Sequence, residues 1–188
     1  VTARGMAFVP SIDMQALMQS PEGIAWVEEK SPLRQLDHIR RLLNQHADEL
    51  LNSLIAPAQA ADLLLGGLVS EPFAISLGEK LGTPVITAPL QPYRPTRSAA
   101  ASLVALLPRL NGPHNRWLGR IGQRMLWNVA ADTAGRLRQR LDLPPQVRTE
   151  AIERQNATPA VFGFSPSVTP QPADWPPHVR VAGYWFPD

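Results

Sequence analysis

The stretch DLLLGGLVSEPFAISLGEKLGTPVITAPL, residues 62–90, decides the fold class. It begins with an apolar run of strand length, 62–67, that ends in two glycines. A helix is predicted from Ser70 to a glycine cap at Gly82, and the β-branched run 83–90 follows as a second strand. Strand, helix and strand within about 29 residues is the size of a βαβ crossover. We therefore predict an α/β protein with a Rossmann-like parallel sheet and helices on both faces.

Two further helices are predicted from apolar residues that recur three or four positions apart. The first begins at Ser31 and runs to about Leu54, and its other face should lie on the surface. That face carries Arg34, Asp37, Arg41, Gln45 and Asp48. The second covers 115–141, where glycines at 119, 122 and 135 lower the helix propensity and make a break conceivable.

Short strands are predicted at 5–10, 160–164 and 179–185. Between them, prolines 92 and 95 exclude helix and central strand from QPYRPTRSAAAS, residues 91–102. This segment is therefore expected to be a loop at the carboxyl end of a parallel strand.

Composition sets limits on the class of protein. The chain has 188 residues, which suits one domain with a substantial core. Its pI of about 9.5 reflects arginines, because only Lys30 and Lys80 are lysines, and a net charge of +2 is no nucleic-acid signature. Cysteine is absent, so disulfides and thiolate chemistry are excluded. The sequence has no apolar run long enough to span a membrane and no signal-peptide pattern. We expect a cytoplasmic protein, with peripheral membrane contact as an open alternative.

Ligands of parallel α/β sheets bind outside the carboxyl ends of the strands. Three stretches are expected there: 66–72, 89–97 and 164–168. Ser70 and Glu71 could hold an anion or hydroxyl at a helix N-terminus, or simply cap that helix. The loop PLQPYRPTR, residues 89–97, offers Gln91, Tyr93, Thr96 and Arg97 to a small molecule, or is a solvent loop ordered by its prolines.

Other polar clusters are weaker candidates. Arg116, Arg120 and Arg124 form a stripe on one face of a predicted helix, which favours a solvated face over a phosphate or acidic-membrane patch. The histidines at 38, 46, 114 and 178 are scattered, so no metal site is expected. No established catalytic motif occurs in the sequence.

The end of the chain, PAVFGFSPSVTPQPADWPPHVRVAGYWFPD (159–188), resembles a known family. It is similar to the end of the acceptor-binding domain of GT-B glycosyltransferases, in the UDP-glycosyltransferase group that contains sterol glucosyltransferases and antibiotic glycosyltransferases. Three earlier segments resemble the family in the same order. They are SPEGIAW (20–26), the stretch 62–97 and RLRQRLDLPP (136–145).

The resemblance implies a division of labour in a longer chain. Residues 1–180 would be part of the acceptor-binding domain, and 181–188 the start of a linker to a donor-binding domain. The first strand of the sheet, a glycine-rich turn and the catalytic base would lie upstream of Val1. This stretch alone is therefore expected to be marginally stable and inactive.

The implied reaction moves a sugar from a nucleotide-sugar co-substrate, with UDP or dTDP as carrier, to a hydroxyl of a lipophilic acceptor such as a sterol, polyketide or lipid. No other cofactor is implied. The residues expected to bind the acceptor are Gln91, Pro92, Tyr93, Thr96 and Arg97, with Ser70, Glu71 and Phe73 as secondary candidates.

Two departures from the family leave the acceptor undefined. Asp142 stands where the family often has glycine, and RSAAAS (97–102) lacks the acidic and aromatic residues often found there. A second hypothesis is a non-catalytic module that binds a hydrophobic ligand or a partner. A nucleic-acid binder ranks last, because only the arginine stripe supports it.

Overall fold

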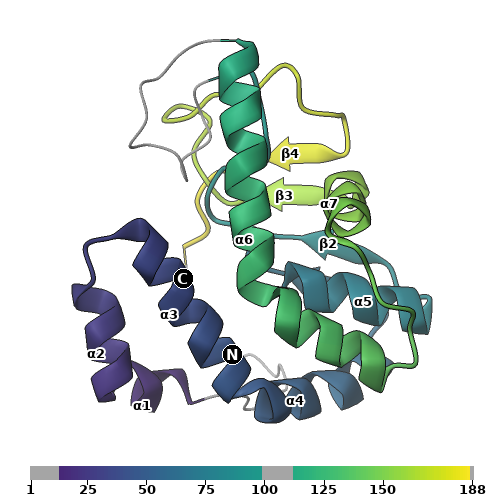
Figure 1. Cartoon of the computed structure of the whole chain (residues 1–188). Helices are drawn as coiled ribbons and strands as arrows, with labels where there is room; N and C mark the ends of the chain where they lie inside the picture. The colour runs from purple at the N-terminus through teal and green to yellow at the C-terminus, as the bar shows by residue number, and fades with distance from the viewer. Residues whose placement is uncertain (1–12, 99–111, 187–188) are drawn as a thin grey trace. The chain divides into compact units, whose positions relative to one another are not determined.

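The computed structural model describes residues 13–98 and 112–186 (Figure 1). The chain divides into two compact units, the first reaching Asp62 and the second beginning at Leu63. The strand predicted at 5–10 lies outside the described residues.

The first unit contains four helices within its described residues: α1 (Met14–Gln19), α2 (Pro21–Glu28), α3 (Pro32–Gln45) and α4 (Ala47–Gln59). Ser20 caps α2, since its hydroxyl accepts a hydrogen bond from the N–H of Gly23 at 3.1 Å. The charged face predicted for the helix that begins near Ser31 is confirmed as exposed.

The prediction of one helix from Ser31 to about Leu54 is wrong, because the helix breaks at His46. Leu42, Ala47 and Leu51 are all buried. On a continuous helix, residues five positions apart lie about 140° apart around the axis. The break therefore allows both Leu42 and the first residues of α4 to be buried. This burial outweighs the local preference for one continuous helix.

The second unit is built on a four-stranded sheet in the order β1-β2-β3-β4, with every neighbouring pair parallel. The strands are β1 (Leu64–Gly66), β2 (Val85–Thr87), β3 (Ala160–Phe162) and β4 (Val179–Val181). The α/β class and the Rossmann-like parallel sheet are confirmed. Because these strands neighbour one another in sequence order, any further strand has to pair at the outer edge of β1 or β4.

Three helices of this unit are α5 (Glu71–Leu81), α6 (Pro113–Arg140) and α7 (Arg148–Ala157). Right-handed crossovers between strands laid down in one direction place their helices on one face of the sheet. The contacts agree, since α5 and α7 meet next to Thr87 and α6 packs on the Phe162 cluster. These helices account for one of the two faces predicted to be covered, and helices on the other face stay a prediction. Figure 1 shows α6 running across the direction of the strands, past β4, β3 and β2.

Helix α6 is continuous over 28 residues, so its glycines do not break it. Gly119 instead allows a close approach: a Cβ there would lie 2.9 Å from Cα of Pro95. The glycine therefore lets the loop after β2 lie against the helix. Asp142, just after α6, has a φ of 53°, the left-handed conformation that glycine adopts most readily and aspartate tolerates. This conformation explains why glycine suits that position.

Aromatic side chains fill the core beside β3. Phe162 stacks on Trp175 with ring centroids 4.8 Å apart and lies 5.8 Å from the ring of Tyr93. Phe164, Ala160 and Val179 complete this buried cluster. The last strand is shorter than predicted, because β4 ends at Val181 and only the N–H groups of Ala182 and Gly183 continue the ladder.

Two helical glycines predict opposite effects of the same substitution. A Cβ on Gly78 would lie 2.3 Å from Cγ2 of Val85 and 2.8 Å from the carbonyl oxygen of Thr83, so Gly78→Ala should cost about 1–3 kcal/mol of unfolding free energy through overpacking. Gly135 is exposed and has nothing within 4 Å of an added Cβ. Gly135→Ala should therefore stabilise the protein by about 0.5–1 kcal/mol. Urea denaturation measures both, and equal effects would contradict this account of α5 packing.

Candidate functional site

The segments that follow the strands lie side by side at the carboxyl edge of the sheet. The N–H of Ala88 donates to the carbonyl oxygen of Gly66 at 2.7 Å, and that of Gly163 donates to Pro89 at 2.9 Å. The N–H of Gly183 donates to Phe164 at 3.1 Å. The fold thus brings the segments after all four strands to one edge, where ligands of such sheets bind.

Apolar side chains are exposed at this edge. Val69 follows β1 and is 38% exposed, and Leu90 follows β2 and is 62% exposed. Trp185, 47% exposed, follows β4. Leu90 and Trp185 both flank Gly163, since a Cβ on that glycine would lie 2.9 Å from Leu90 and 3.0 Å from Trp185. We call Val69, Leu90 and Trp185 the apolar edge.

The predicted acceptor-binding residues divide by exposure. Gln91 and Arg97 are exposed, and Pro92 and Ser70 are partly buried. The remaining four are buried inside the second unit: Glu71, Phe73, Tyr93 and Thr96. The Ser70 hydroxyl oxygen accepts a hydrogen bond from the N–H of Gly67 at 2.8 Å, and it makes no capping bond to α5.

Glu71 lies at the centre of a buried polar cluster. The Tyr93 hydroxyl donates to its Oε2 at 2.6 Å, and Nε2 of Gln155 donates to the same oxygen at 3.3 Å. Arg94 approaches Oε1 with an N–O distance of 3.7 Å. The first residue of α5 is therefore bound to the loop after β2 and to α7.

Arg94 is the residue that connects these elements. Its side chain is 3% exposed, and Nη2 donates to the carbonyl oxygens of Gln155 at 2.7 Å and Thr158 at 2.8 Å. Carbonyls at the C-terminal end of a helix carry partial negative charge, which suits a guanidinium. Arg94 thus fixes the loop 91–98 to the end of α7.

Burial dominates the acid–base properties of this cluster. It raises the pKa of Glu71 to about 6, more than the Tyr93 hydrogen bond and the Arg94 charge lower it. Burial, together with the negative charge of Glu71, also raises the pKa of the Tyr93 phenol. Tyr93 is therefore a hydrogen-bond donor to the carboxylate and not a base.

A second carboxylate anchors the other end of the loop. Asp174 accepts a hydrogen bond from the Thr96 hydroxyl at 2.5 Å and another from the N–H of Arg97 at 2.9 Å. Partial burial acts to raise the pKa of Asp174, but these two hydrogen bonds, a further one from its own backbone N–H and the charge of Arg116 together hold that pKa below its usual range. Asn115 of α6 also donates to the carbonyl of Arg97 at 3.1 Å.

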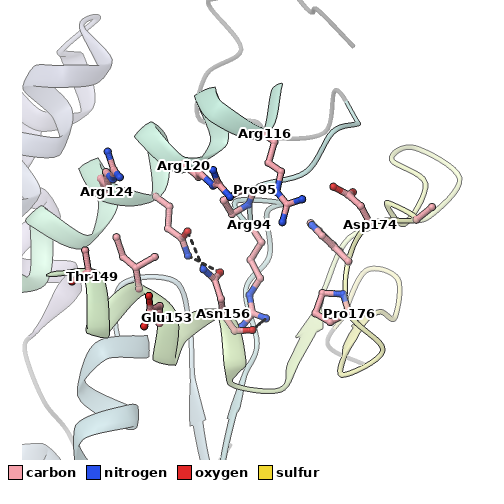
Figure 2. A pocket seen from close by; sticks show the side chains of 14 residues that line it. Arg94, Pro95, Arg116, Arg120, Arg124, Thr149, Glu153, Asn156, Asp174 and Pro176 are labelled. Atoms are coloured by element: carbon pink, nitrogen blue, oxygen red, sulfur yellow. Dashed lines mark hydrogen bonds between the residues drawn. The ribbon is translucent and has the colours of Figure 1, made fainter. Parts of the chain in front are cut away.

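A pocket of about 630 Å³ lies between α6, α7 and the segment 173–176 (Figure 2). The stripe Arg116, Arg120 and Arg124 lines it from α6. All three side chains are exposed, so the solvated face that the sequence favoured is confirmed. Figure 2 shows Thr149, Glu153 and Asn156 on the α7 side.

Sequence reasoning missed several of these residues. Arg94 and Arg97 have similar local sequences, because each follows a proline and one polar residue. The sequence therefore does not indicate that Arg94 is buried and Arg97 is exposed. Gln155 belongs to α7, which was not predicted. Asp174 lies in the Asp-Trp-Pro segment that supported the family resemblance, and that segment was the available signal.

Within 13–98 and 112–186, no three His, Asp or Glu side chains gather closely enough to hold a metal ion. None of the helices over the same residues combines the length and the apolar character required to cross a membrane.

Comparison with known proteins adds the family context. No protein-family model matches the chain. It is 31% identical over 141 residues to the sterol 3-beta-glucosyltransferase of Neurospora crassa, which covers 75% of this chain and 9% of that protein. The protein of the same name from Komagataella phaffii is 31% identical over 140 residues, or 74% of this chain and 11% of its own length.

The corresponding protein of Cryptococcus neoformans is 30% identical over 144 residues, covering 75% of this chain and 9% of that protein. The chain thus spans about a tenth of the length of the curated relatives it matches. These similarities support the glycosyltransferase family that the sequence motifs predicted.

The raised pKa of Glu71 predicts a pH-dependent stability. Since the native state holds this proton more tightly than the unfolded chain, the contribution of Glu71 is largest below its ordinary pKa of 4.5 and is lost as pH rises through about 6. The loss should amount to about 1–2 kcal/mol. Glu71→Gln, which cannot ionise, should remove this dependence.

Urea denaturation between pH 4.5 and 7 measures the effect as the difference between the wild type and Glu71→Gln. The exposed carboxylate of Glu150 supplies the matched control, Glu150→Gln. A difference that is constant across this pH range would show that Glu71 is ionised normally in the folded protein.

Proposed function

We propose that the chain is the acceptor-binding part of a glycosyltransferase that transfers a sugar to a hydroxyl of a sterol or similar lipophilic acceptor. The observation that carries this proposal is the apolar edge, whose Leu90 directly precedes the exposed Gln91, in a chain similar to sterol 3-beta-glucosyltransferases. Apolar surface with a few polar groups is the usual lining of a small-molecule site.

The acceptor has an apolar ring system and a polar hydroxyl group, and each would contact a different part of the site. Its ring system would cover Leu90, Val69 and Trp185 and remove their apolar surface from water. Its hydroxyl would lie toward the exposed amide of Gln91 or the guanidinium of Arg97, both of which donate hydrogen bonds. Pro92 would complete the wall, and Ser70 would lie at its rim.

The buried candidates take a positioning role in this proposal. Glu71, Tyr93 and Thr96 form their hydrogen bonds with other residues of the protein, and Phe73 is buried in α5. They would hold the loop 91–98 in one conformation, so that Gln91 and Arg97 need no reordering when the acceptor binds. Direct contact with the acceptor is assigned to the exposed residues.

The remaining parts of the reaction are assigned to a longer protein. The nucleotide-sugar donor, with UDP or dTDP as carrier, would bind a domain that follows the linker 181–188, and a base that precedes this chain would deprotonate the acceptor hydroxyl. The lengths of the relatives support this division. We also propose a cytoplasmic location with peripheral contact to the membrane that holds the acceptor.

Substitutions at the exposed loop residues test the acceptor assignment in the longer enzyme. Gln91→Ala and Arg97→Ala should each raise the acceptor KM about tenfold, the cost of one hydrogen bond to the acceptor, and leave the donor KM within about twofold. Arg136→Ala, on an exposed position of α6, is the matched control. Equal effects on donor and acceptor KM would reject this placement.

The 188-residue chain by itself provides a second test. It should bind a fluorescent sterol in a titration yet give no sugar transfer with UDP-glucose and the same sterol. Turnover by this chain would show that the base and donor site lie within it. Sterol binding by a naturally complete protein of this length, without transfer, would favour the non-catalytic module instead.

A further inference from the structure

The pocket of about 630 Å³ between α6 and α7 has an excess of positive charge. Four arginines line it: the stripe Arg116, Arg120 and Arg124, and the buried Arg94, whose charge is opposed by Glu71. Two carboxylates, Glu153 and Asp174, stand against them. Asp174 already accepts two hydrogen bonds from the loop 91–98, so its capacity to neutralise the stripe is reduced.

Across the described part of the chain, no carboxylate lies within ion-pair distance of Arg116, Arg120 or Arg124. The charge of Arg116 does contribute to lowering the pKa of Asp174. Figure 2 shows the three side chains along one side of α6, with Arg116 extending toward the segment that carries Asp174. Arginines spaced four residues apart normally repel one another.

Among the described residues, the pocket lining also contains two unpaired hydrogen-bond donors. Two buried N–H groups of lining residues, Nε1 of Trp175 and Nε of Arg94, have no acceptor among the described residues. At the base of the pocket, by contrast, Gln123 and Asn156 satisfy each other, with Nε2 of Gln123 donating to Oδ1 of Asn156 at 2.9 Å. The unmatched donors add to the positive potential of the wall.

From this juxtaposition we propose that the pocket binds an organic phosphate. The forked guanidinium groups of Arg120 and Arg116 match the oxygens of a phosphate, which accept two parallel hydrogen bonds. Thr149 lies in the first turn of α7, where the helix dipole also favours an anion. Nothing in this site overlaps the apolar edge, so the inference is independent of the proposed function.

The size and walls of the pocket define the rest of the ligand. A single phosphate would fill a small part of about 630 Å³, a volume in the range of small-molecule sites. Pro95, Ile152 and Pro176 supply apolar walls for an organic group. A soluble nucleoside diphosphate and the headgroup of an anionic phospholipid share this chemistry.

Calorimetric titration of the 188-residue chain with inorganic pyrophosphate and with UDP tests the site. Arg116→Ala/Arg120→Ala should weaken binding at least about tenfold, because each lost charged hydrogen bond is worth about that factor. Arg136→Ala/Arg180→Ala removes the same charge from exposed positions outside the pocket, and it should change binding less than about twofold. All four side chains are exposed, so the variants should melt at the temperature of the wild type.

Vesicle co-sedimentation distinguishes the sources of the phosphate. Binding to phosphatidylcholine vesicles that contain phosphatidic acid, lost in the stripe variant only, would identify a lipid headgroup. Tighter binding of UDP than of pyrophosphate, without vesicle binding, would identify a soluble nucleotide. The proposal is overturned if no probe binds, or if the stripe variant and the control variant weaken binding equally.

Discussion

The second unit depends on one buried cation, Arg94. A guanidinium that is 3% exposed costs several kcal/mol to remove from water, so it persists only where the fold surrounds it with acceptors. Glu71 supplies the opposite charge from the start of α5, and Gln155 and Thr158 supply carbonyl oxygens at the end of α7. Because these acceptors belong to different elements, the requirement to satisfy one side chain fixes α5, α7 and the loop after β2 together.

The same requirement explains why one loop has both buried and exposed functional groups. Arg94 holds the middle of 91–98 on the inside, and Asp174 holds Thr96 near its end. Between and around these anchors, prolines restrict the backbone. Gln91 and Arg97 are left exposed on a segment whose position is fixed by interior contacts. Because such a loop is already ordered, a ligand that binds to it does not have to offset the entropy cost of ordering the loop.

Local patterns predicted the elements whose positions follow from sequence periodicity. The βαβ unit, its Gly82 cap and the length of α6 could be predicted because each depends on neighbours in the chain. Helix α7 could not, since RTEAIERQNA has few apolar residues and its buried Gln155 is held by partners far away in sequence. The burial of Glu71 and Tyr93, and the break at His46, also arise from tertiary contacts that no local pattern encodes.

The loop 91–98 also joins the two candidate ligand sites of the unit. Gln91 directly follows Leu90 of the apolar edge, whereas Arg94 and Pro95 line the pocket that carries the arginine stripe. Pro95 packs directly on α6, where Gly119 leaves no space for a side chain. An anion that contacts the α6 arginines would therefore act on the helix against which this loop rests. Glu71 and Asp174 anchor this loop, so the same two carboxylates hold in place both the exposed Gln91 and the pocket residues Arg94 and Pro95.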